Sequence, residues 1–409
     1  MLPPSDSPPG KRLRVLHSFP HRLGKSRICT TAWHEIDSVA EAGAEMTVLA
    51  GDSVRPFQRP LRMKTTLAWR SLRWPYRLLG TRLTCALHDW KVAQHLPAMA
   101  GKIDIIHAWP LGALHTMRAA KKLGIPVALE RCNAHTRFAY QVVKEECDRI
   151  GVPLPHDHEH AYNEGVLRRE EAEYAMADGI LCPSEFVRHT FLDAGFPDEK
   201  LMRFIYGVDE KRFHPEPRHA PASLGLKMVF VGVCAVRKGL HFALEAWLNS
   251  EACKDGQFQI AGDFIPGYRA YLESRLAHPS VKVLGHRDDI PMLMRESDLF
   301  VLPSIEEGFG LVCTEAMASG CVPLVSDACT DLCRHLDNSM VHRVANVAAL
   351  TDHINQLHRN RELLFHLRAA GLRAVPEISW KVAGHSLLGA YRQIVDLKNT
   401  PSKRLALAH

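Results

Sequence analysis

Short apolar segments alternate with stretches of helical periodicity along the chain, and this alternation begins twice. In the first half, the apolar runs include residues 13–17, 45–50 and 126–130. The pattern begins again at residues 227–231 and continues to 322–326. Strands that alternate with helices form a parallel sheet with helices on both faces. The sequence therefore predicts an α/β protein with two Rossmann-like, doubly wound parallel-sheet domains.

The length of 409 residues supports two domains, because a single hydrophobic core stops growing at about 250–300 residues. Residues 1–10 are rich in Pro and Ser and are predicted to be a disordered tail. We expect an N-terminal domain over 11–205, a hinge rich in turn residues over 206–217, and a C-terminal domain over 218–378. Ligands bind outside the carboxyl ends of the strands in such sheets, so a cleft that the two sheets face is the predicted site.

Composition excludes several classes of protein. With 46% hydrophobic and 23% charged residues and a net charge of +6, the chain has an ordinary globular balance. It has no apolar run of 18 residues for a membrane helix, and no secretory signal is expected at the N-terminus. The 11 cysteines include no CxxC pair, which argues against a disulfide framework and favours the reducing cytoplasm.

Residues 55–82 form a basic stretch with eight Lys and Arg residues and no Asp or Glu. Trp69, Trp74 and Tyr76 lie among them, and basic residues interleaved with aromatic ones suit an anionic membrane surface. Alternatively, Trp69 and Leu72 pack inward while the arginines are solvated or pair with acids elsewhere. No nucleic-acid recognition module accompanies the stretch, so nucleic acid is not expected as a partner.

Two groups of residues are compatible with a metal, and each has a plainer interpretation. His156, His158 and His160 alternate with acids, either as ligands or as a solvated or cleft-lining loop. Cys329, Cys333 and His335 form a looser cluster whose spacing fits no common zinc site. The chain contains no Asp-x-Asp, the usual sign of a metal-held nucleotide sugar. We therefore expect no metal among the site residues.

The segment 303–320 is the most informative stretch. A strand leads into a loop with two acids, and glycines mark the start of a helix that carries Glu315. The free backbone N–H groups of residues 308–311, together with the helix dipole, make an anion pocket. Because carboxylates repel phosphate, Glu307 and Glu315 are expected to accept hydrogen bonds from hydroxyl groups. A ligand with both anions and hydroxyls is a sugar nucleotide. In the plainer interpretation, Glu306 and Glu307 merely favour a helix N-terminus.

This segment resembles the Glu-x7-Glu signature of the retaining glycosyltransferase family 4, whose members have the GT-B fold. Other segments also resemble the family's motifs, namely 182–187, 206–215, 230–239, 283–290 and 297–303. The resemblance implies a GT-B arrangement of two Rossmann-like domains facing a cleft. It also implies that the predicted last helix, 380–397, packs back on the N-terminal domain. The implied reaction moves a sugar from a nucleoside-diphosphate sugar to an acceptor hydroxyl, without a metal or other cofactor.

The resemblance also implies roles for individual residues. Glu307, as a catalytic residue, would hold the hydroxyls of the donor sugar, and Glu315 would hold the ribose diol. Lys238 would neutralise the diphosphate. The position of a further family arginine is taken by Val233, and Arg237, beside Lys238, is the candidate to replace it. The remaining donor-binding residues implied by the family are Gly285 near the nucleotide base and Gly308, Phe309, Gly310 and Leu311 around the sugar and phosphate.

His135 follows the predicted strand 126–130, where the family places a catalytic-site histidine, and His107 is a second candidate. The implied partners are a nucleotide sugar and a glycan or lipid-linked acceptor, and the protein would act in the cytoplasm or at the inner face of the membrane. Two other functions stay open. One is a phosphorylase or nucleotide-sugar epimerase on the same fold, and the other is a non-catalytic GT-B-like protein that binds a sugar or lipid.

Overall fold

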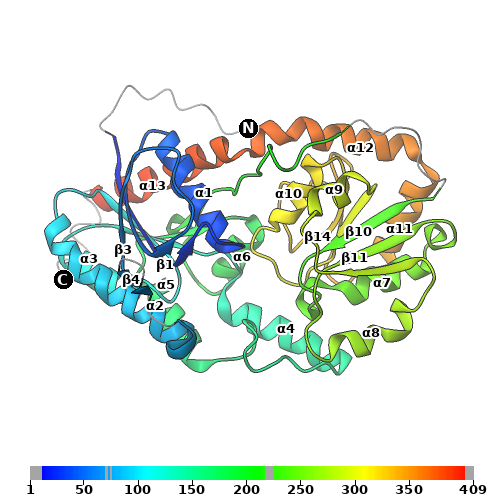
Figure 1. Ribbon diagram of the computed structural model, residues 1–409, viewed down its shortest axis with the longest axis horizontal. Helices are drawn as coiled ribbons and strands as arrows, with labels where there is room; N and C mark the ends of the chain where they lie inside the picture. Colours follow the sequence, from blue (N-terminus) through cyan, green and yellow to red (C-terminus); the bar gives the residue numbers. More distant parts are fainter. Residues whose placement is uncertain (1–11, 70–71, 74–75, 217–224, 401–409) are drawn as a thin grey trace. The chain divides into compact units, whose positions relative to one another are not determined.

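The computed structural model describes residues 12–69, 72–73, 76–216 and 225–400 (Figure 1). The predicted tail at 1–10 lies outside these residues. The chain forms two compact units. The first unit comprises the described residues up to Glu130, then Arg168–Leu181 and the residues from Ala383. The second unit comprises Arg131–Leu167 and Cys182–Val382.

The first unit is built on a parallel sheet in which the strands follow the order β3-β2-β1-β6-β7-β8. Figure 1 shows α1 and α13 on one side of this sheet and α2 and α3 on the other. The strands and the short hairpin are β1 (Arg14–Leu23), β2 (Glu45–Ser53), β3 (Arg62–Thr65), β4 (Ala68–Trp69), β5 (Leu72–Arg73), β6 (Ile105–Ala108), β7 (Val127–Glu130) and β8 (Gly179–Cys182). The helices are α1 (Ile28–Glu41), α2 (Tyr76–His95), η1 (Leu96–Met99), α3 (Leu114–Lys122), α5 (Glu164–Met176) and α13 (Trp380–Asn399).

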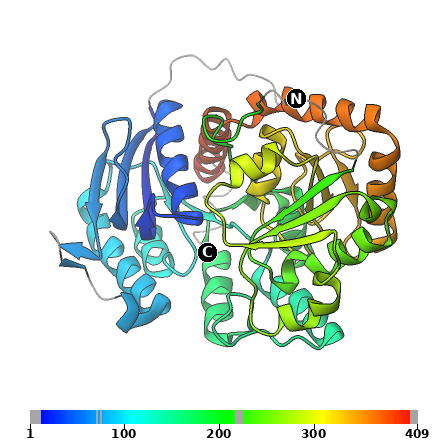
Figure 2. The same ribbon diagram turned by 45° about the vertical axis from the view of Figure 1, so that its right-hand side comes forward.

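The second unit contains a parallel sheet in the order β12-β11-β10-β13-β14-β15, with helices on both faces (Figure 2). The strands of this sheet are β10 (Lys227–Val231), β11 (Gln257–Ala261), β12 (Val281–Gly285), β13 (Leu299–Leu302), β14 (Val322–Ser326) and β15 (Met340–His342). This unit also contains the short strand β9 (Leu201–Arg203), which is not part of this sheet. Its α-helices are α4 (Thr136–Ile150), α6 (Glu185–Asp193), α7 (Leu240–Asn249), α8 (Tyr268–Leu276), α9 (Ile290–Arg295), α10 (Leu311–Ala318), α11 (Val347–Arg359) and α12 (Arg361–Ala374). Its 3-10 turns are η2 (Asp198–Lys200), η3 (Val236–Lys238), η4 (Glu251–Lys254) and η5 (Val375–Ile378).

Strand order fixes where the second unit can bind a ligand. Strand β10 pairs with β11 on one side and with β13 on the other, so the winding of the chain reverses between β10 and β13. In doubly wound sheets, ligands bind outside the carboxyl ends of the strands at such a reversal. The segments that leave β10 and β13 there are 232–239 and 303–310.

The compact units do not follow the predicted boundary at 206–217. Residues 131–167 and 182–205, which the sequence assigned to the N-terminal domain, belong to the second unit. The loop before α4 and the loop after β13 explain this, because the N–H of Ala134 donates to Glu306 Oε1 at 2.9 Å. The residues from Ala383 on α13 belong to the first unit, where Tyr391 Oη lies 2.6 Å from His107 Nδ1. No helix of the described residues has the length and apolarity needed to cross a bilayer.

Candidate functional site

Two loops meet at the reversal point of the second sheet. The N–H of Ile305 donates to the carbonyl oxygen of Arg237 at 2.8 Å. A Cβ at Gly239 would lie 2.0 Å from the carbonyl oxygen of Pro303, so only glycine permits this close approach. The loop after β10 therefore holds Arg237 and Lys238 beside the two acids of the loop after β13.

Glu307 is bound by both cations of the neighbouring loop. Lys238 Nζ forms an ion pair with its Oε2, and an Arg237 guanidinium nitrogen lies 3.5 Å from its Oε1. Only about a tenth of the Glu307 side chain is exposed. Burial opposes ionisation, but Lys238 and Arg237 outweigh it and lower the pKa of Glu307. Glu307 is therefore a carboxylate at neutral pH whose two cations are already in place.

Glu306 is an internal anchor. It is fully buried and contacts three groups: the N–H of Ala134 at 2.9 Å, His160 Nε2 at 3.1 Å and Arg237 at 3.3 Å. Burial raises the pKa of this carboxyl group, but His160 and Arg237 lower it further, so that the net pKa lies below its usual range. The adjacent acids thus differ in role, because Glu306 fastens three segments of the second unit together while Glu307 faces the cations.

Backbone N–H groups open the site at the start of α10. Residues 308–310 are buried, and among the described residues none accepts a hydrogen bond from the N–H of Gly308, Phe309, Gly310 or Leu311. A helix leaves its first N–H groups without an acceptor in the helix, and with the helix dipole such a row can bind an anion. Gly310 reaches the helix with a φ of 67°, a conformation that favours glycine.

The loop before α4 packs against the same glycines. A Cβ at Gly308 would lie 1.6 Å from the carbonyl oxygen of Cys132, so a side chain there would displace this loop. Ser184 Oγ donates to the carbonyl oxygen of Gly308 at 2.6 Å and fixes it from another side. The phenyl ring of Phe309 meets Tyr206 edge-on at 5.3 Å. The glycine loop is therefore held rigidly by three segments of the second unit.

His135 lies in the loop that touches Gly308, at the start of α4. Its N–H donates to Thr190 Oγ1 at 3.0 Å, and its ring meets Phe191 edge-on at 5.1 Å. Burial lowers the pKa of His135 to about 4, and the charges of Arg131 and Arg137 act in the same direction. The imidazole is therefore neutral at pH 7, so it can accept or donate a hydrogen bond without carrying charge.

Glu315 lies about one and a half turns into α10 and is half-buried. Burial raises the pKa of Glu315 to about 7; the charge of Arg212 opposes this, and that of Asp209 adds to it. The carboxyl group therefore titrates close to neutral pH. Since Arg212 and Asp209 lie in the predicted hinge segment, this segment adjusts a pKa that burial raises.

We expect the affinity for a nucleoside-diphosphate sugar to rise between pH 6 and pH 8. Only the ionised Glu315 accepts hydrogen bonds from two ribose hydroxyls, and its pKa of about 7 means that it ionises in this interval. The diphosphate of the nucleotide sugar itself does not titrate in this pH interval. Calorimetric titration at a series of pH values measures the change. In Glu315→Gln the rise should disappear; a rise that persists in this variant would refute the ribose assignment.

Gly285 lies apart from these groups. It lines a pocket of about 370 Å³ beyond the carboxyl ends of β11 and β12. The other residues that line this pocket are 262–267, Arg269 and Val283. Asp263 links this pocket to the loop after β10, because its carbonyl oxygen accepts the N–H of Cys234 at 2.9 Å. The pocket does not include Glu307, so the predicted donor residues divide into a charged part and this separate recess.

The residues that hold the two acids of the site in place were not predicted from the sequence. His160 belongs to the His156–His160 run, but the described residues of this run do not gather as metal ligands, and neither do Cys329, Cys333 and His335. The signal that identifies His160 is instead its contact with Glu306. His107 is fully buried in the first unit, against Tyr391 and Glu130.

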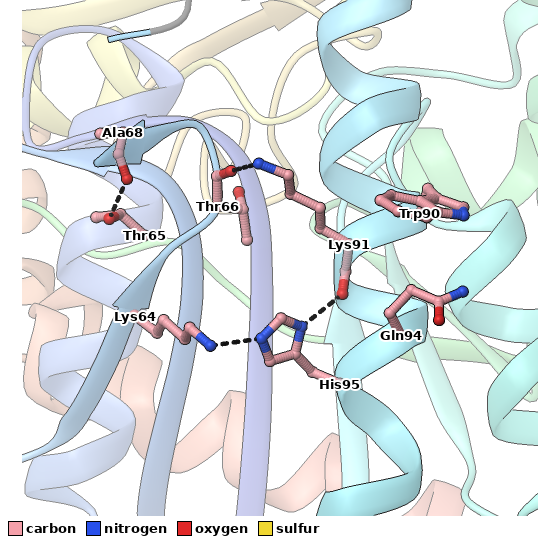
Figure 3. A pocket seen from close by; sticks show the side chains of 8 residues that line it. All are labelled: Lys64, Thr65, Thr66, Ala68, Trp90, Lys91, Gln94 and His95. Atoms are coloured by element: carbon pink, nitrogen blue, oxygen red, sulfur yellow. Dashed lines mark hydrogen bonds between the residues drawn. The ribbon is translucent and has the colours of Figure 1, made fainter. Parts of the chain in front are cut away.

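A further pocket of about 400 Å³ belongs to the first unit (Figure 3). Figure 3 shows Lys64 of β3 pointing toward His95 of α2, with the ammonium 2.6 Å from Nε2. Lys91 Nζ donates to the carbonyl oxygen of Thr66 at 2.6 Å, and half of Trp90 is exposed beside it. The lining therefore combines two ammonium groups with an aromatic face.

Some described arginines of the basic stretch pair with acids elsewhere in the chain. Arg59 pairs with Glu41 at 3.2 Å, and Arg62 pairs with Glu45 at 3.3 Å. The guanidinium of Arg55 lies over the Trp33 ring, 3.7 Å from its centre. Arg70 and Trp74 lie outside the described residues, as do the side chains of Trp69, Leu72, Arg73, Tyr76 and Arg77.

Two protein-family descriptions match the chain. "Glycosyltransferase Family 4" matches residues 30–212, and "Glycosyl transferases group 1" matches residues 225–360, which together make up most of the chain. Among curated proteins, the phosphatidyl-myo-inositol mannosyltransferase of Mycobacterium leprae is 32% identical over 56% of this chain and 62% of its own length. The lipopolysaccharide core biosynthesis mannosyltransferase LpsB of Rhizobium meliloti is 33% identical over 32% of this chain and 42% of its own length. The chain thus spans less than two thirds of either relative.

Solved structures with similar folds cover nearly the whole chain. HepE of Anabaena, solved in complex with UDP, has a TM-score of 0.63 and 16% identity, covering 93% of this chain and 100% of its own. The sucrose-phosphate synthase of Thermosynechococcus elongatus has a TM-score of 0.67 and 17% identity, covering 95% of this chain and 100% of its own. At these identities the likeness concerns the fold.

Proposed function

Because the chain belongs to glycosyltransferase family 4 and has the GT-B fold, we propose that it transfers a sugar from a nucleoside-diphosphate sugar to an acceptor hydroxyl. One observation carries the proposal. The N–H groups of residues 308–311 have no acceptor among the described residues, and they follow directly on a carboxylate held by two cations. A ligand that binds to both the N–H groups and the carboxylate must carry negatively charged acceptor oxygens and donor hydroxyls, as a sugar diphosphate does.

In the proposed complex each group has a distinct task. The N–H groups of residues 308–310 receive the diphosphate and the sugar, and Lys238 balances the charge of the leaving diphosphate. Glu307 accepts hydrogen bonds from the sugar hydroxyls. Arg237 remains with Glu306 and Glu307, because it is buried between them. The recess at Gly285 receives the base, and neutral His135 lies near the transferred sugar.

We propose that the transfer retains the anomeric configuration and needs no metal at the diphosphate. Lys238 and the dipole of α10 supply the positive charge that a metal ion gives elsewhere. The acceptor attacks on the face that the diphosphate leaves, and the departing phosphate oxygen takes the acceptor proton. The rate should be the same in an assay with chelator as in one with free Mg²⁺ or Mn²⁺ and no chelator. Stimulation of about tenfold or more would contradict this part of the proposal.

We expect Lys238→Ala to weaken the binding of a nucleoside diphosphate by about 10–100-fold, the cost of one charge-assisted hydrogen bond. The ammonium has Glu307 as its partner without ligand and would exchange it for the diphosphate. Calorimetry with UDP and GDP measures the loss, and Lys238→Arg is the matched control that keeps the charge. Equal affinity in wild type and Lys238→Ala would remove Lys238 from the donor site.

For the acceptor, we propose a glycan or lipid-linked hydroxyl compound with an anionic group that the first unit binds. Lys64, Lys91 and the exposed face of Trp90 support this, since they combine positive charge with an aromatic surface in one pocket. Flotation with vesicles containing anionic lipid tests whether the anion is a membrane surface. Wild type should float, and Lys64→Gln should float less. If wild type does not float, the anion is not a membrane surface but an anionic group on a free acceptor.

The transferase itself is tested with a donor panel. UDP- and GDP-sugars are incubated with the full chain, and release of the free nucleoside diphosphate is measured with and without candidate lipid-linked acceptors. Release that depends on acceptor supports transfer. Stabilisation against heat by nucleotide sugars without any release would instead identify a non-catalytic sugar-binding protein.

A further inference from the structure

Four polar side chains meet in the core of the first unit. His17 on β1 and His107 on β6 are register partners in adjacent parallel strands, and their ring centres lie 4.3 Å apart. Glu35 reaches them from α1, and Tyr391 reaches them from α13. Figure 1 shows these two helices on the same side of the sheet. His17 and His107 are completely buried, and Glu35 is 2% exposed.

This cluster has more polar atoms than hydrogen bonds. Both ring nitrogens of His17, both carboxylate oxygens of Glu35 and Nε2 of His107 are buried without a hydrogen-bond partner. Each such atom costs about 1–3 kcal/mol, and native proteins contain few of them. Five in one place in the core of a well-packed sheet are unusual, and an ion bound among them would satisfy one atom of each side chain.

The geometry is that of a ligand set. One ligand atom from each of His17, Glu35 and His107 lies within 4.8 Å of the others. Glu130 at the end of β7 adds a carboxylate oxygen 3.2 Å from His107 Nε2. The other nitrogen of His107 is 2.6 Å from Tyr391 Oη, and this hydrogen bond points Nε2 toward the cluster. Metal-binding histidines are usually oriented by such a second contact.

We propose that the first unit binds one divalent transition-metal ion, with Zn²⁺ the best fit, through His17, Glu35 and His107. Two imidazoles and one carboxylate are a donor set that Zn²⁺ uses in proteins, with bonds of about 2.0–2.2 Å. Because the site is buried in the core of the first unit, the ion is structural: it ties β1, β6 and α1 together and takes no part in sugar transfer.

This site is independent of the proposed function. Its ligands belong to the first unit, whereas the residues proposed for the donor belong to the second. A buried ion exchanges only when the first unit opens, so a chelator present during an assay would leave it in place. Failure of the donor panel would leave this proposal untouched, and the reverse also holds.

Metal analysis of the full chain tests the proposal. Protein expressed with added Zn²⁺ is dialysed against chelator and its metals are measured by mass spectrometry. We expect about one equivalent per chain in wild type and less than about a tenth in Glu35→Gln, which keeps the volume of the side chain. His88→Gln is the matched control. His88 is also completely buried in the first unit but is hydrogen-bonded to Ser18 and Thr66, so this variant should keep the ion.

A second measurement covers the case in which Glu35→Gln does not fold. Wild type is unfolded in denaturant and refolded with Zn²⁺, with Co²⁺ or with chelator alone. The Zn²⁺ form should melt several degrees above the chelator form, and the Co²⁺ form should show the intense visible absorption of a tetrahedral site. The proposal would be overturned if wild type is metal-free after expression and all three preparations melt at the same temperature. A full equivalent of metal in folded Glu35→Gln would overturn it as well.

Discussion

Glu307→Gln is expected to lower kcat/KM for the donor by about 100-fold or more while the protein stays folded. The substitution keeps the shape of the side chain but removes the charge that holds Lys238 and Arg237. It also replaces an acceptor of two hydroxyl hydrogen bonds by a weaker one. Loss of a charge-assisted hydrogen bond in a dry site costs about 2–4 kcal/mol in the transition state.

The measurement is steady-state release of nucleoside diphosphate with the donor that the panel identifies. Glu273→Gln, an exposed glutamate on α8, is the control and should keep wild-type rates. If Glu307→Gln also keeps wild-type rates with every donor that wild type uses, Glu307 does not contact the donor sugar.

Glu306→Gln is expected to have the largest effect on stability, a loss of about 3 kcal/mol in the free energy of unfolding. The variant leaves the buried guanidinium of Arg237 without its closest carboxylate and removes the charged partner of His160. Breaking one side of a buried ion pair is costly because the other charge stays buried. Chemical denaturation at pH 7 measures the difference.

The pH dependence of this effect has a definite sign. The pKa of Glu306 in the folded protein is lowered, so its carboxylate stabilises the protein at pH values above 4.5, the ordinary pKa of a glutamate. This contribution to stability is lost as the pH falls below that value. The gap between wild type and Glu306→Gln should therefore be widest at neutral pH and shrink in acid. A variant as stable as wild type at pH 7 would show that Glu306 is not an anchor.

The strands that frame the site were predictable, because each is a short apolar run with turn residues at both ends. Strands β10 and β14 coincide with the apolar runs 227–231 and 322–326 from which they were predicted. The order of helices and strands was enough to place 303–310 at a carboxyl end, where ligands bind. Local pattern therefore located the loop that contains Glu307.

Local pattern could not separate Glu306 from Glu307. The two acids are adjacent, and only the tertiary contacts of Ala134 and His160 show that Glu306 is an internal anchor. For the same reason the predicted domain boundary differs from the compact units, since 131–167 interacts with residues that follow it by more than 100 positions. The buried cluster of His17 and Glu35 was not predicted, because a strand and a helix bring these residues together and no local motif marks them.

The central claim is that the loop between β13 and α10 receives a sugar diphosphate. The direct test is a crystal structure of the full chain with a nucleoside-diphosphate sugar at saturating concentration. We expect phosphate oxygens against the N–H groups of Gly308–Leu311, Lys238 turned from Glu307 to the diphosphate, and Glu307 on the sugar hydroxyls. A structure in which the nucleotide binds elsewhere, while the Lys238–Glu307 pair stays intact over an empty loop, would contradict it.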